Sequence, residues 1–164
     1  MLKDEKKNSQ SKFNIRAAIP TDLESIYNII KPYADEQIIL ERSENDILLN
    51  LDKFIIAQHE DEIVGVVSYY DYGNELKEIR SLAVKKNRNK RGVGSLLLNT
   101  IVKFLLNNFP DAKIFVLTYS PIFFKKNDFI CIPRDSLPEK IWKDCQNCKN
   151  KDNCNEIALM FSNT

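Results

Sequence analysis

The stretch from Leu76 to Leu98 constrains the fold of this chain more than any other. It reads LKEIRSLAVKKNRNKRGVGSLLL. Alternating apolar residues in its first third predict a β-strand, and the leucine-rich run at its end predicts an amphipathic helix. A cationic segment with Gly92 and Gly94 lies between them. The chain is therefore expected to pass from a strand, through a glycine loop, directly into a helix N-terminus.

Such a junction suits a phosphate ligand. The first turn of a helix leaves about four backbone N–H groups unpaired and carries about half a positive charge. Gly92 and Gly94 remove side chains where a ligand would approach the backbone. Five cationic residues add positive charge nearby, namely Lys85, Lys86, Arg88, Lys90 and Arg91. The pattern predicts a polyphosphate ligand, and the alternative is an ordinary strand–helix turn with incidental glycines.

Two familiar phosphate loops do not fit this segment. The P-loop pattern G-x-x-x-x-G-K-[ST] is absent, and the dinucleotide pattern G-x-G-x-x-G requires a glycine where this chain has Leu97. The segment instead resembles the acyl-CoA loop of the GCN5-related N-acetyltransferases (GNAT). That resemblance implies that the strand end and the loop bind acetyl-CoA, largely through backbone N–H groups. The residues concerned are Leu82, Ala83, Val84, Asn89, Lys90, Arg91, Gly92, Val93, Gly94 and Ser95, together with Phe124 on a later short helix.

Length and composition favour one globular domain. The chain has 164 residues, of which 43% are hydrophobic and 29% charged, and its net charge of +1 offers no field that would attract nucleic acid or a membrane surface. Residues 1–12 are polar and are expected to form a disordered leader before a single domain at 13–164. The chain shows no secretory signal and no apolar run of about 18 residues, so a cytoplasmic protein is expected.

The hydrophobic pattern also predicts the other elements. Thr21 is expected to cap a first helix with Glu24 as its capping-box partner, and Pro32 to kink or end that helix. Ser43 is expected to cap a second, short helix. The helix after the glycine loop is expected to end before Pro110 and to bury Leu96, Leu97, Ile101, Phe104 and Leu105. Strands are expected at about 13–18, 53–58, 63–70, 75–84, 113–119, 129–133 and 156–161.

This order of elements resembles the GNAT fold, which is α+β with α/β/α layers and a central mixed, mostly antiparallel sheet with splayed strands. The segments EIRSLAV at 78–84, FVLTY at 115–119 and LPEKIWKDC at 137–145 resemble, more narrowly, the stand-alone bacterial amino-acid N-acetyltransferases related to N-acetylglutamate synthase. The resemblance implies acetyl transfer from acetyl-CoA to an amino acid, with L-glutamate at the entry to arginine synthesis as the leading acceptor. It also makes a homodimer an expectation.

Direct transfer needs a neutral amine beside the thioester, so a base must lie within hydrogen-bond reach, directly or through one water. Glu78 matches the proposed base of the synthase family, and a solvated strand carboxylate is the alternative. Many relatives protonate the leaving thiolate with a tyrosine on the short helix, where this chain has Phe124. Tyr119, Ser120 or solvent is expected to take that role.

A dicarboxylic acceptor requires cations, and arginine binds carboxylates best because its guanidinium is two-pronged. Arg42 and Ser43 match an Arg-Ser pair of the family, and Arg80 and Ser81 lie on the strand before the glycine loop. These four residues are the candidate acceptor site. The alternative for Arg42 is a surface charge paired with a neighbouring carboxylate, either Glu44 or Asp46.

The tail from about 137 to 156 is rich in cysteine. Cys145, Cys148 and Cys154 offer three thiolates for a structural zinc ion, with Cys131 or His59 as the fourth ligand, and free thiols are the alternative. The sequence thus leaves three functional hypotheses. The first is an N-acetyltransferase acting on an amino acid or on another amine. The others are a non-catalytic acyl-CoA sensor and a zinc-stabilised interaction module.

Overall fold

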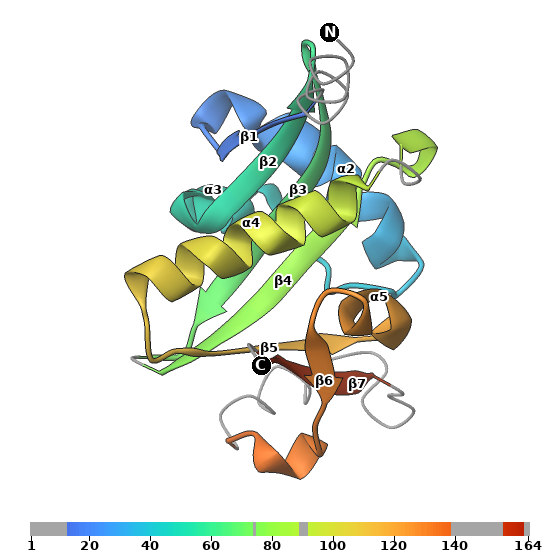
Figure 1. Ribbon diagram of the computed structural model, residues 1–164. Coiled ribbons are helices and arrows are strands. Elements are labelled where there is room, and N and C mark those ends of the chain that lie inside the picture. Colours follow the sequence, from blue (N-terminus) through green and yellow to red (C-terminus); the bar gives the residue numbers. More distant parts are fainter. Residues whose placement is uncertain (1–12, 74, 89–91, 139–155, 163–164) are drawn as a thin grey trace, which may run out of the picture.

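The computed structural model describes residues 13–73, 75–88, 92–138 and 156–162, which form one seven-stranded sheet with helices on both faces (Figure 1). Its strands are β1 (Asn14–Ala17), β2 (Phe54–His59), β3 (Glu62–Asp71), β4 (Leu76–Val84), β5 (Lys113–Thr118), β6 (Phe129–Cys131) and β7 (Ile157–Phe161). The strand order is β1-β2-β3-β4-β5-β7-β6. Only β4 and β5 pair in parallel, and the other neighbours are antiparallel.

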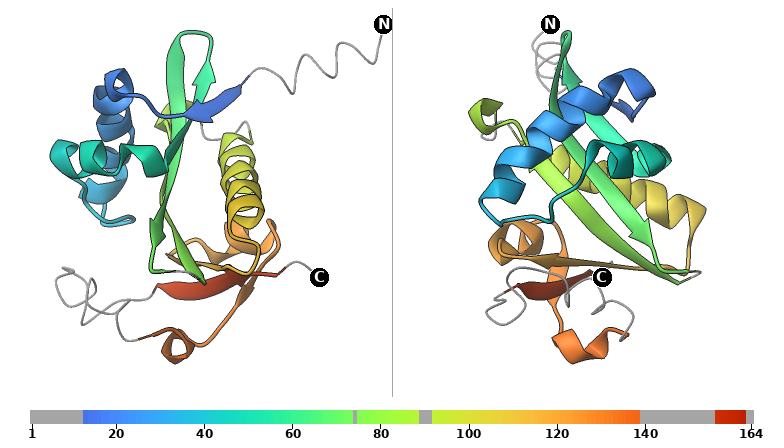
Figure 2. Two further views of the ribbon diagram at one scale, coloured as in Figure 1. Left: turned by 90° about the vertical axis from the view of Figure 1, so that its left-hand side faces the viewer. Right: turned by 180° about the vertical axis from the view of Figure 1, so that it is seen from behind.

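The helices form two layers around this sheet. They are α2 (Leu23–Asp35), α3 (Glu44–Leu49), α4 (Val93–Asn108) and α5 (Pro121–Lys125). Figure 2 shows α2 and α3 on one face of the strands β2 to β4 and α4 on the opposite face. The predicted α+β class, its layers and the order of its elements are confirmed. No helix in the described part of the chain is long and apolar enough to span a membrane.

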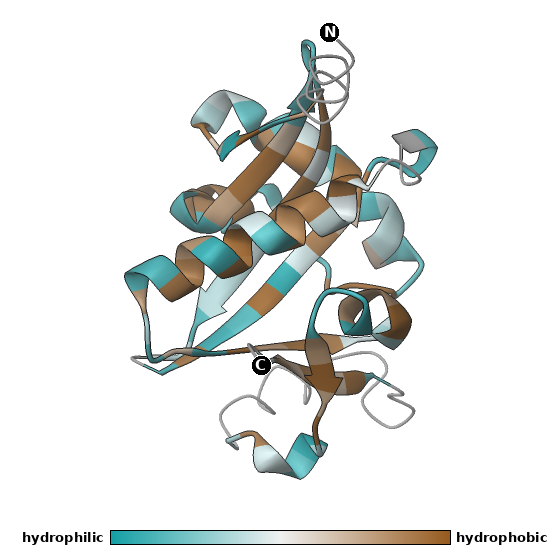
Figure 3. Ribbon diagram, in the orientation of Figure 1, coloured by the Kyte–Doolittle hydropathy of each residue, from teal (hydrophilic) through white to brown (hydrophobic). Residues whose placement is uncertain are grey.

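Helix α4 buries a stripe that differs from the predicted one. The buried residues are Val93, Leu97, Leu98, Ile101, Val102 and Leu105. Leu96 is only half-buried, and Phe104 is 41% exposed at the side of the stripe, where its ring lies 6.2 Å from that of Tyr69. The prediction for these two residues was wrong because a helix of 3.6 residues per turn can direct only one face toward the sheet. Figure 3 shows hydrophobic and hydrophilic residues alternating along α4, as expected for a helix that buries one face.

The start of α2 also differs from its prediction. Thr21 and Glu24 do not cap it, because residues Pro20–Asp22 form a 3-10 turn ahead of the helix. The Asp22 carboxylate accepts the Ile19 N–H at 2.8 Å and binds the Arg16 guanidinium through two contacts, at 2.7 and 3.0 Å. Asp22 is thus the residue that fixes the turn between β1 and α2.

Helix α2 does not stop at Pro32. It continues to Asp35, so the alternative of an early end was wrong, and Tyr33, one residue beyond the proline, still packs against the core on this face of the sheet. In contrast, Ser43 caps α3 as predicted, with its Oγ accepting the Asp46 N–H at 3.1 Å.

The Arg16–Asp22 ion pair predicts a pH-dependent stability. Arg16 holds the pKa of Asp22 below its usual range, so the pair stabilises the fold fully above the unfolded pKa of about 3.9. That contribution is lost as the pH falls through the lower folded pKa. Replacing Asp22 by Asn should cost about 1.5–3 kcal/mol in urea unfolding at pH 7 and less near pH 3, which lies below the unfolded pKa.

The matched control is Asp52→Asn, because Asp52 is exposed and its contact with Lys53 is 3.6 Å long. That change should alter the unfolding free energy by less than about 1 kcal/mol at either pH. A loss for Asp22→Asn that is equal at both pH values would contradict the role of the ion pair.

Candidate active site

Strands β4 and β5 separate in the middle of the sheet. They pair only from Leu76 to Glu78 on β4, opposite Lys113 to Phe115 on β5, although both strands continue beyond this point. Figure 1 shows them together near the β3–β4 hairpin and diverging toward α5. The peptide groups of β4 after Glu78 therefore line a gap between the two strands.

A bulge lies on β4 beside this gap. Ser68 pairs with Arg80 and Val66 with Ala83, so one residue of β3 faces two of β4, and Ser81 adopts a left-handed φ of +52°. A left-handed conformation is uncommon for a residue other than glycine and is often found at functional sites. The bulge turns the side chains around Ser81 relative to an unbroken strand.

Helix α4 begins beside the end of β4. Gly92 is its N-cap residue with a left-handed φ of +73°, and a Cβ added to Gly92 would meet nothing within 4 Å. A Cβ on Gly94 would approach the Phe123 ring to 3.3 Å, so this glycine allows α5 to pack closely. The two glycines thus act differently. Gly92 permits the turn and leaves its surroundings open, whereas Gly94 serves packing.

The positive charge near this helix start is lower than its sequence indicates. Lys85 pairs with Glu62 at 2.9 Å, and Lys86 pairs with Glu36 at 2.5 Å. Two of the five predicted cations are therefore partly neutralised by carboxylates from β3 and from the end of α2. The binding of an anion here depends more on the helix N-terminus than the sequence suggested.

Glu78 lies at the point where the strands separate, and its carboxylate is buried. The residue is 6% exposed. Arg80 Nε donates to Glu78 Oε1 at 2.5 Å, and the Tyr72 hydroxyl donates to the same oxygen at 3.1 Å. Arg80 also donates to the Tyr72 hydroxyl at 2.8 Å, which closes a three-membered network. The alternative of a solvated strand carboxylate is therefore wrong.

Aromatic rings enclose this network. The Arg80 guanidinium lies 4.3 Å from the centre of the Tyr70 ring, and the Tyr72 ring packs 5.9 Å from that of Phe115. Burial, reinforced by the charge of Glu78, raises the pKa of Tyr72 well above its usual value. Tyr72 therefore remains a protonated donor to Glu78 at neutral pH.

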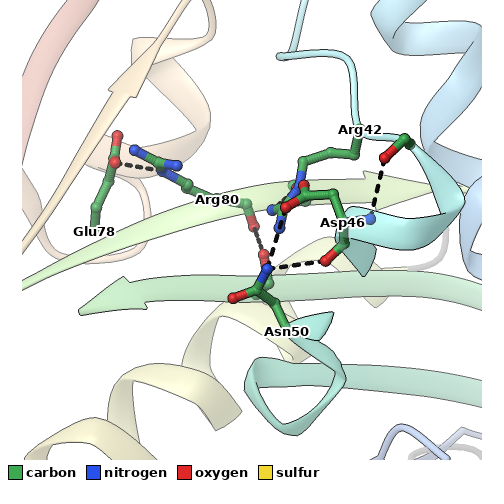
Figure 4. Close-up of polar contacts among 8 residues, drawn as sticks. Arg42, Asp46, Asn50, Glu78 and Arg80 are labelled. Atoms are coloured by element: carbon green, nitrogen blue, oxygen red, sulfur yellow. Dashed lines mark hydrogen bonds and ion pairs between the residues drawn. The ribbon is translucent and has the colours of Figure 1, made fainter. Parts of the chain in front are cut away.

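Arg42 reaches the same face of the sheet from the segment before α3 (Figure 4). Its Nη1 donates to Ser81 Oγ at 3.2 Å, and its Nε donates to Asp46. The Arg42 side chain is 12% exposed and lies 5.2 Å from the centre of the Phe54 ring. The predicted pairing with Asp46 exists, but Arg42 is no surface charge.

A row of four side chains thus lies on one face of the sheet: Glu78, Arg80 and Ser81 of β4, and Arg42, which contacts Ser81. The sequence predicted Glu78 as the base and the other three as acceptor-binding residues. Ser43 is exposed and caps α3. A shallow pocket next to this row is lined by Arg42 and Glu41 and by the α2 residues Tyr27, Ile30, Lys31, Ala34 and Asp35.

The remaining predicted residues lie on the other side of the gap. Tyr119 is half-buried directly after β5, and Ser120 is exposed at the start of α5. Phe124 is 4% exposed, and its ring packs against Phe123 and Phe129 at 5.1 and 5.4 Å. A ligand would touch Phe124 only if this core opened. Ser95, in the first turn of α4, accepts a hydrogen bond from Asn127 at 3.3 Å.

Several predicted residues lie outside the described part of the chain. They are Asn89, Lys90 and Arg91 of the loop and Cys145, Cys148 and Cys154 of the tail. Within the described residues, no group of three or more His, Cys, Asp or Glu side chains could hold a metal ion. The zinc site stays a prediction.

Sequence reasoning missed Tyr72 and Asp46. Tyr72 lies in the turn between β3 and β4, and its contact with Glu78 forms only when the hairpin folds. A tyrosine six residues before Glu78, across a hairpin turn at Gly73, is the signal that could have identified it. Asp46 was considered only as a reason to dismiss Arg42, whereas the structure shows that it orients Arg42 toward Ser81.

Comparisons with known proteins identify the family of the chain. Residues 21–121 match the model of the acetyltransferase (GNAT) family. An uncharacterised N-acetyltransferase of Chlorobaculum tepidum is 34% identical over 146 residues, which cover 89% of this chain and 94% of the relative. An amino-acid acetyltransferase of Buchnera aphidicola is 30% identical over 132 residues, which cover 79% of this chain. The match spans only 30% of that relative's length.

Solved structures share the fold. N-acetylglutamate synthase of Neisseria gonorrhoeae, in complex with coenzyme A and N-acetylglutamate, superposes with a TM-score of 0.81 at 24% identity, covering 91% of this chain and 34% of the synthase chain. The Mycobacterium tuberculosis protein Rv2747, in complex with coenzyme A, superposes with a TM-score of 0.78 at 20% identity, covering 92% of this chain and 99% of that one. With a family match over residues 21–121 and this shared fold, the chain belongs to the acetyltransferase (GNAT) family.

Proposed function

We propose that this acetyltransferase transfers the acetyl group of acetyl-CoA to the α-amine of a small amino acid, with L-glutamate as the leading acceptor. The observation that carries the proposal is the row of Glu78, Arg80, Ser81 and Arg42 along β4, beside the gap between β4 and β5. The row combines a buried carboxylate with two arginines, which are the groups that an amine and a carboxylate require.

The gap and the helix start suit acetyl-CoA. The edge of β4 beyond its pairing with β5 can pair with the amide-containing arm of the cofactor as it would with another strand. The N-terminus of α4, with open space around Gly92, suits the pyrophosphate. When bound, acetyl-CoA supplies the activated thioester. Leu82, Ala83, Val84 and the segment 89–95 are the proposed cofactor site.

Glu78 is the proposed base. The amine nitrogen forms a bond to the thioester carbonyl carbon, the carbon–sulfur bond breaks, and the amine proton passes to Glu78 directly or through water. Burial removes competing water from this carboxylate, while Tyr72 and Arg80 hold it in one orientation. The thiolate takes a proton from Tyr119, Ser120 or solvent.

The acceptor's carboxylates are the proposed ligands of Arg42, with Ser43, Arg80 and Ser81 around it. Arg42 uses Nε for Asp46 and Nη1 for Ser81, and a guanidinium has five N–H donors, so donors remain for a carboxylate. Support for an amino acid as acceptor also comes from the Buchnera relative, which is named an amino-acid acetyltransferase.

A panel of acceptors tests the proposal. Release of free thiol from acetyl-CoA is measured with L-glutamate, L-glutamine, L-aspartate and a set of neutral and basic amino acids. Glutamate should give the highest kcat/KM, and glutamine tests the need for the side-chain carboxylate at equal length. A preference for another amine would replace the acceptor assignment. Binding of CoA without turnover of any amine would favour the sensor hypothesis.

Replacing Gly92 by Val should abolish the thermal stabilisation that CoA gives to the wild-type protein. Valine strains the left-handed φ of +73°, which shifts the start of α4, and its side chain fills the open space where the pyrophosphate is proposed to bind. The measurement is the shift in Tm on adding CoA.

The control for that change is Gly73→Val, because Gly73 also has a positive φ, of +125°, in open space, but lies in the β3–β4 turn. Gly73→Val should lower the Tm of the free protein and leave the CoA-induced shift in place. An undiminished shift in Gly92→Val would remove this helix start from the cofactor site.

A further inference from the structure

The carbonyl of Val84 points into the gap between β4 and β5. Lys85 donates its N–H to the Val64 carbonyl of β3 at 2.7 Å. The Val84 C=O and the Lys85 N–H belong to one trans peptide group and point in opposite directions, so the Val84 carbonyl faces away from β3. The Val84 N–H lies on the same side of the strand as its carbonyl. They therefore belong to the edge of β4 that β5 leaves open.

A side chain from α2 donates a hydrogen bond to this carbonyl. The Tyr33 hydroxyl donates to the Val84 oxygen at 2.6 Å. The Lys86 ammonium lies 5.0 Å from the centre of the Tyr33 ring, and Lys86 also pairs with Glu36 at the end of α2. Burial raises the pKa of Tyr33, so its hydroxyl is a donor at neutral pH. The C-terminal end of α2 is thus attached to the end of β4.

An extended amide chain in the gap would also donate a hydrogen bond to the Val84 carbonyl. A chain that adds to a strand edge donates its N–H groups to the edge carbonyls, and the arm of acetyl-CoA contains such amides. We propose that the Tyr33 hydroxyl and the amide arm of acetyl-CoA compete for the Val84 carbonyl, so that Tyr33 withdraws when the cofactor enters. This inference rests on the proposed function, because it takes acetyl-CoA as the occupant of the gap.

Withdrawal of Tyr33 would also affect the proposed acceptor site around Arg42. The Tyr33 carbonyl accepts the Ile38 N–H at 2.9 Å, and Gln37 between them has a left-handed φ of +61°. The chain then leads to Arg42, which contacts Ser81 on β4. The cofactor and the acceptor thus meet opposite ends of one segment, residues 33–42. Coupling between two sites is reciprocal, so each ligand changes the affinity of the other by the same factor.

The test compares Tyr33→Phe with the wild type by calorimetric titration of acetyl-CoA. Phenylalanine keeps the ring and removes the competing hydroxyl. The Kd for acetyl-CoA should fall by about three- to tenfold, as expected for the loss of one competing hydrogen bond. Adenosine 3′,5′-bisphosphate, which lacks the amide arm, should bind both proteins equally.

Tyr69→Phe is the matched control, because Tyr69 lies on β3 and its ring packs against Phe104 of α4. It should leave the Kd unchanged. A second variant, Tyr33→Leu, also removes the hydroxyl and should shift the Kd in the same direction if its Tm shows that it folds.

An unchanged or higher Kd in Tyr33→Phe, or an equal gain for adenosine 3′,5′-bisphosphate, overturns the competition. The proposed function fails differently. If the wild type binds acetyl-CoA and acetylates no amino acid, the acceptor assignment fails while the titration still decides the role of Tyr33. If the wild type binds no acetyl-CoA, both proposals fail.

Discussion

Glu78→Gln is expected to lower kcat about 10²- to 10⁴-fold at neutral pH while leaving the Kd for CoA unchanged. Glutamine keeps the shape of the side chain and can still accept hydrogen bonds from Tyr72 and Arg80, but it cannot take the amine proton. The rate should recover at high pH, where more of the acceptor arrives as the neutral amine. Steady-state kinetics from pH 6 to about 10, with CoA titrations, measure both effects.

Two controls accompany Glu78→Gln. The Tm of the variant shows whether the loss of the ion pair with Arg80 has disturbed the fold, since the Arg80 side chain is only 16% exposed. Glu62→Gln removes a β3 carboxylate that pairs with Lys85. Glu62 begins β3, whereas Glu78 pairs with Tyr70 near the other end of that strand, so this change should leave kcat unchanged. Normal turnover of Glu78→Gln at pH 7 would place the base elsewhere or leave proton removal to solvent.

Arg42→Ala is expected to raise the KM for the acceptor amino acid about 10- to 150-fold and to change the KM for acetyl-CoA much less. A charge-assisted contact to a carboxylate contributes about 1.5–3 kcal/mol, which corresponds to this range. Arg42 comes from the segment before α3 and contacts Ser81 of β4, within the proposed acceptor site. The measurement is the KM for each substrate with the other one saturating.

Lys31→Ala provides the matched control for Arg42→Ala. Lys31 lines the same shallow pocket, but its side chain is 50% exposed and pairs with Asp35 on its own helix. It should have little effect on either KM. Arg42→Lys keeps the charge and loses the two-pronged geometry, so an intermediate KM would support a bidentate contact. Equal effects of Arg42→Ala on both substrates would assign Arg42 a structural role.

The contacts of Arg80 bear on whether it binds the acceptor or positions Glu78, two roles that the sequence could not distinguish. Arg80 was proposed as an acceptor ligand, but its guanidinium binds Glu78 and Tyr72 and lies over the Tyr70 ring. These contacts suit a residue that positions the base. A change of Arg80 is therefore expected to affect kcat as well as the KM for the acceptor, unlike a change of Arg42.

The fold class, the order of the elements and the place of the glycine loop could all be predicted from the sequence. Period-two and period-3.6 hydrophobic patterns are local, so they identify β4 and α4 without knowledge of their partners. The motif from Leu82 to Gly94 identified the family for the same reason, because its residues act together within one continuous segment.

The contacts within the candidate active site could be seen only in the folded structure. The sequence contains no sign that Arg42 reaches Ser81 or that Tyr33 holds the Val84 carbonyl 51 residues away. Burial likewise depends on packing, which placed Phe104 at the side of the core and Phe124 inside it. Local patterns specify elements, whereas the environment of each functional group arises from contacts between residues far apart in the chain.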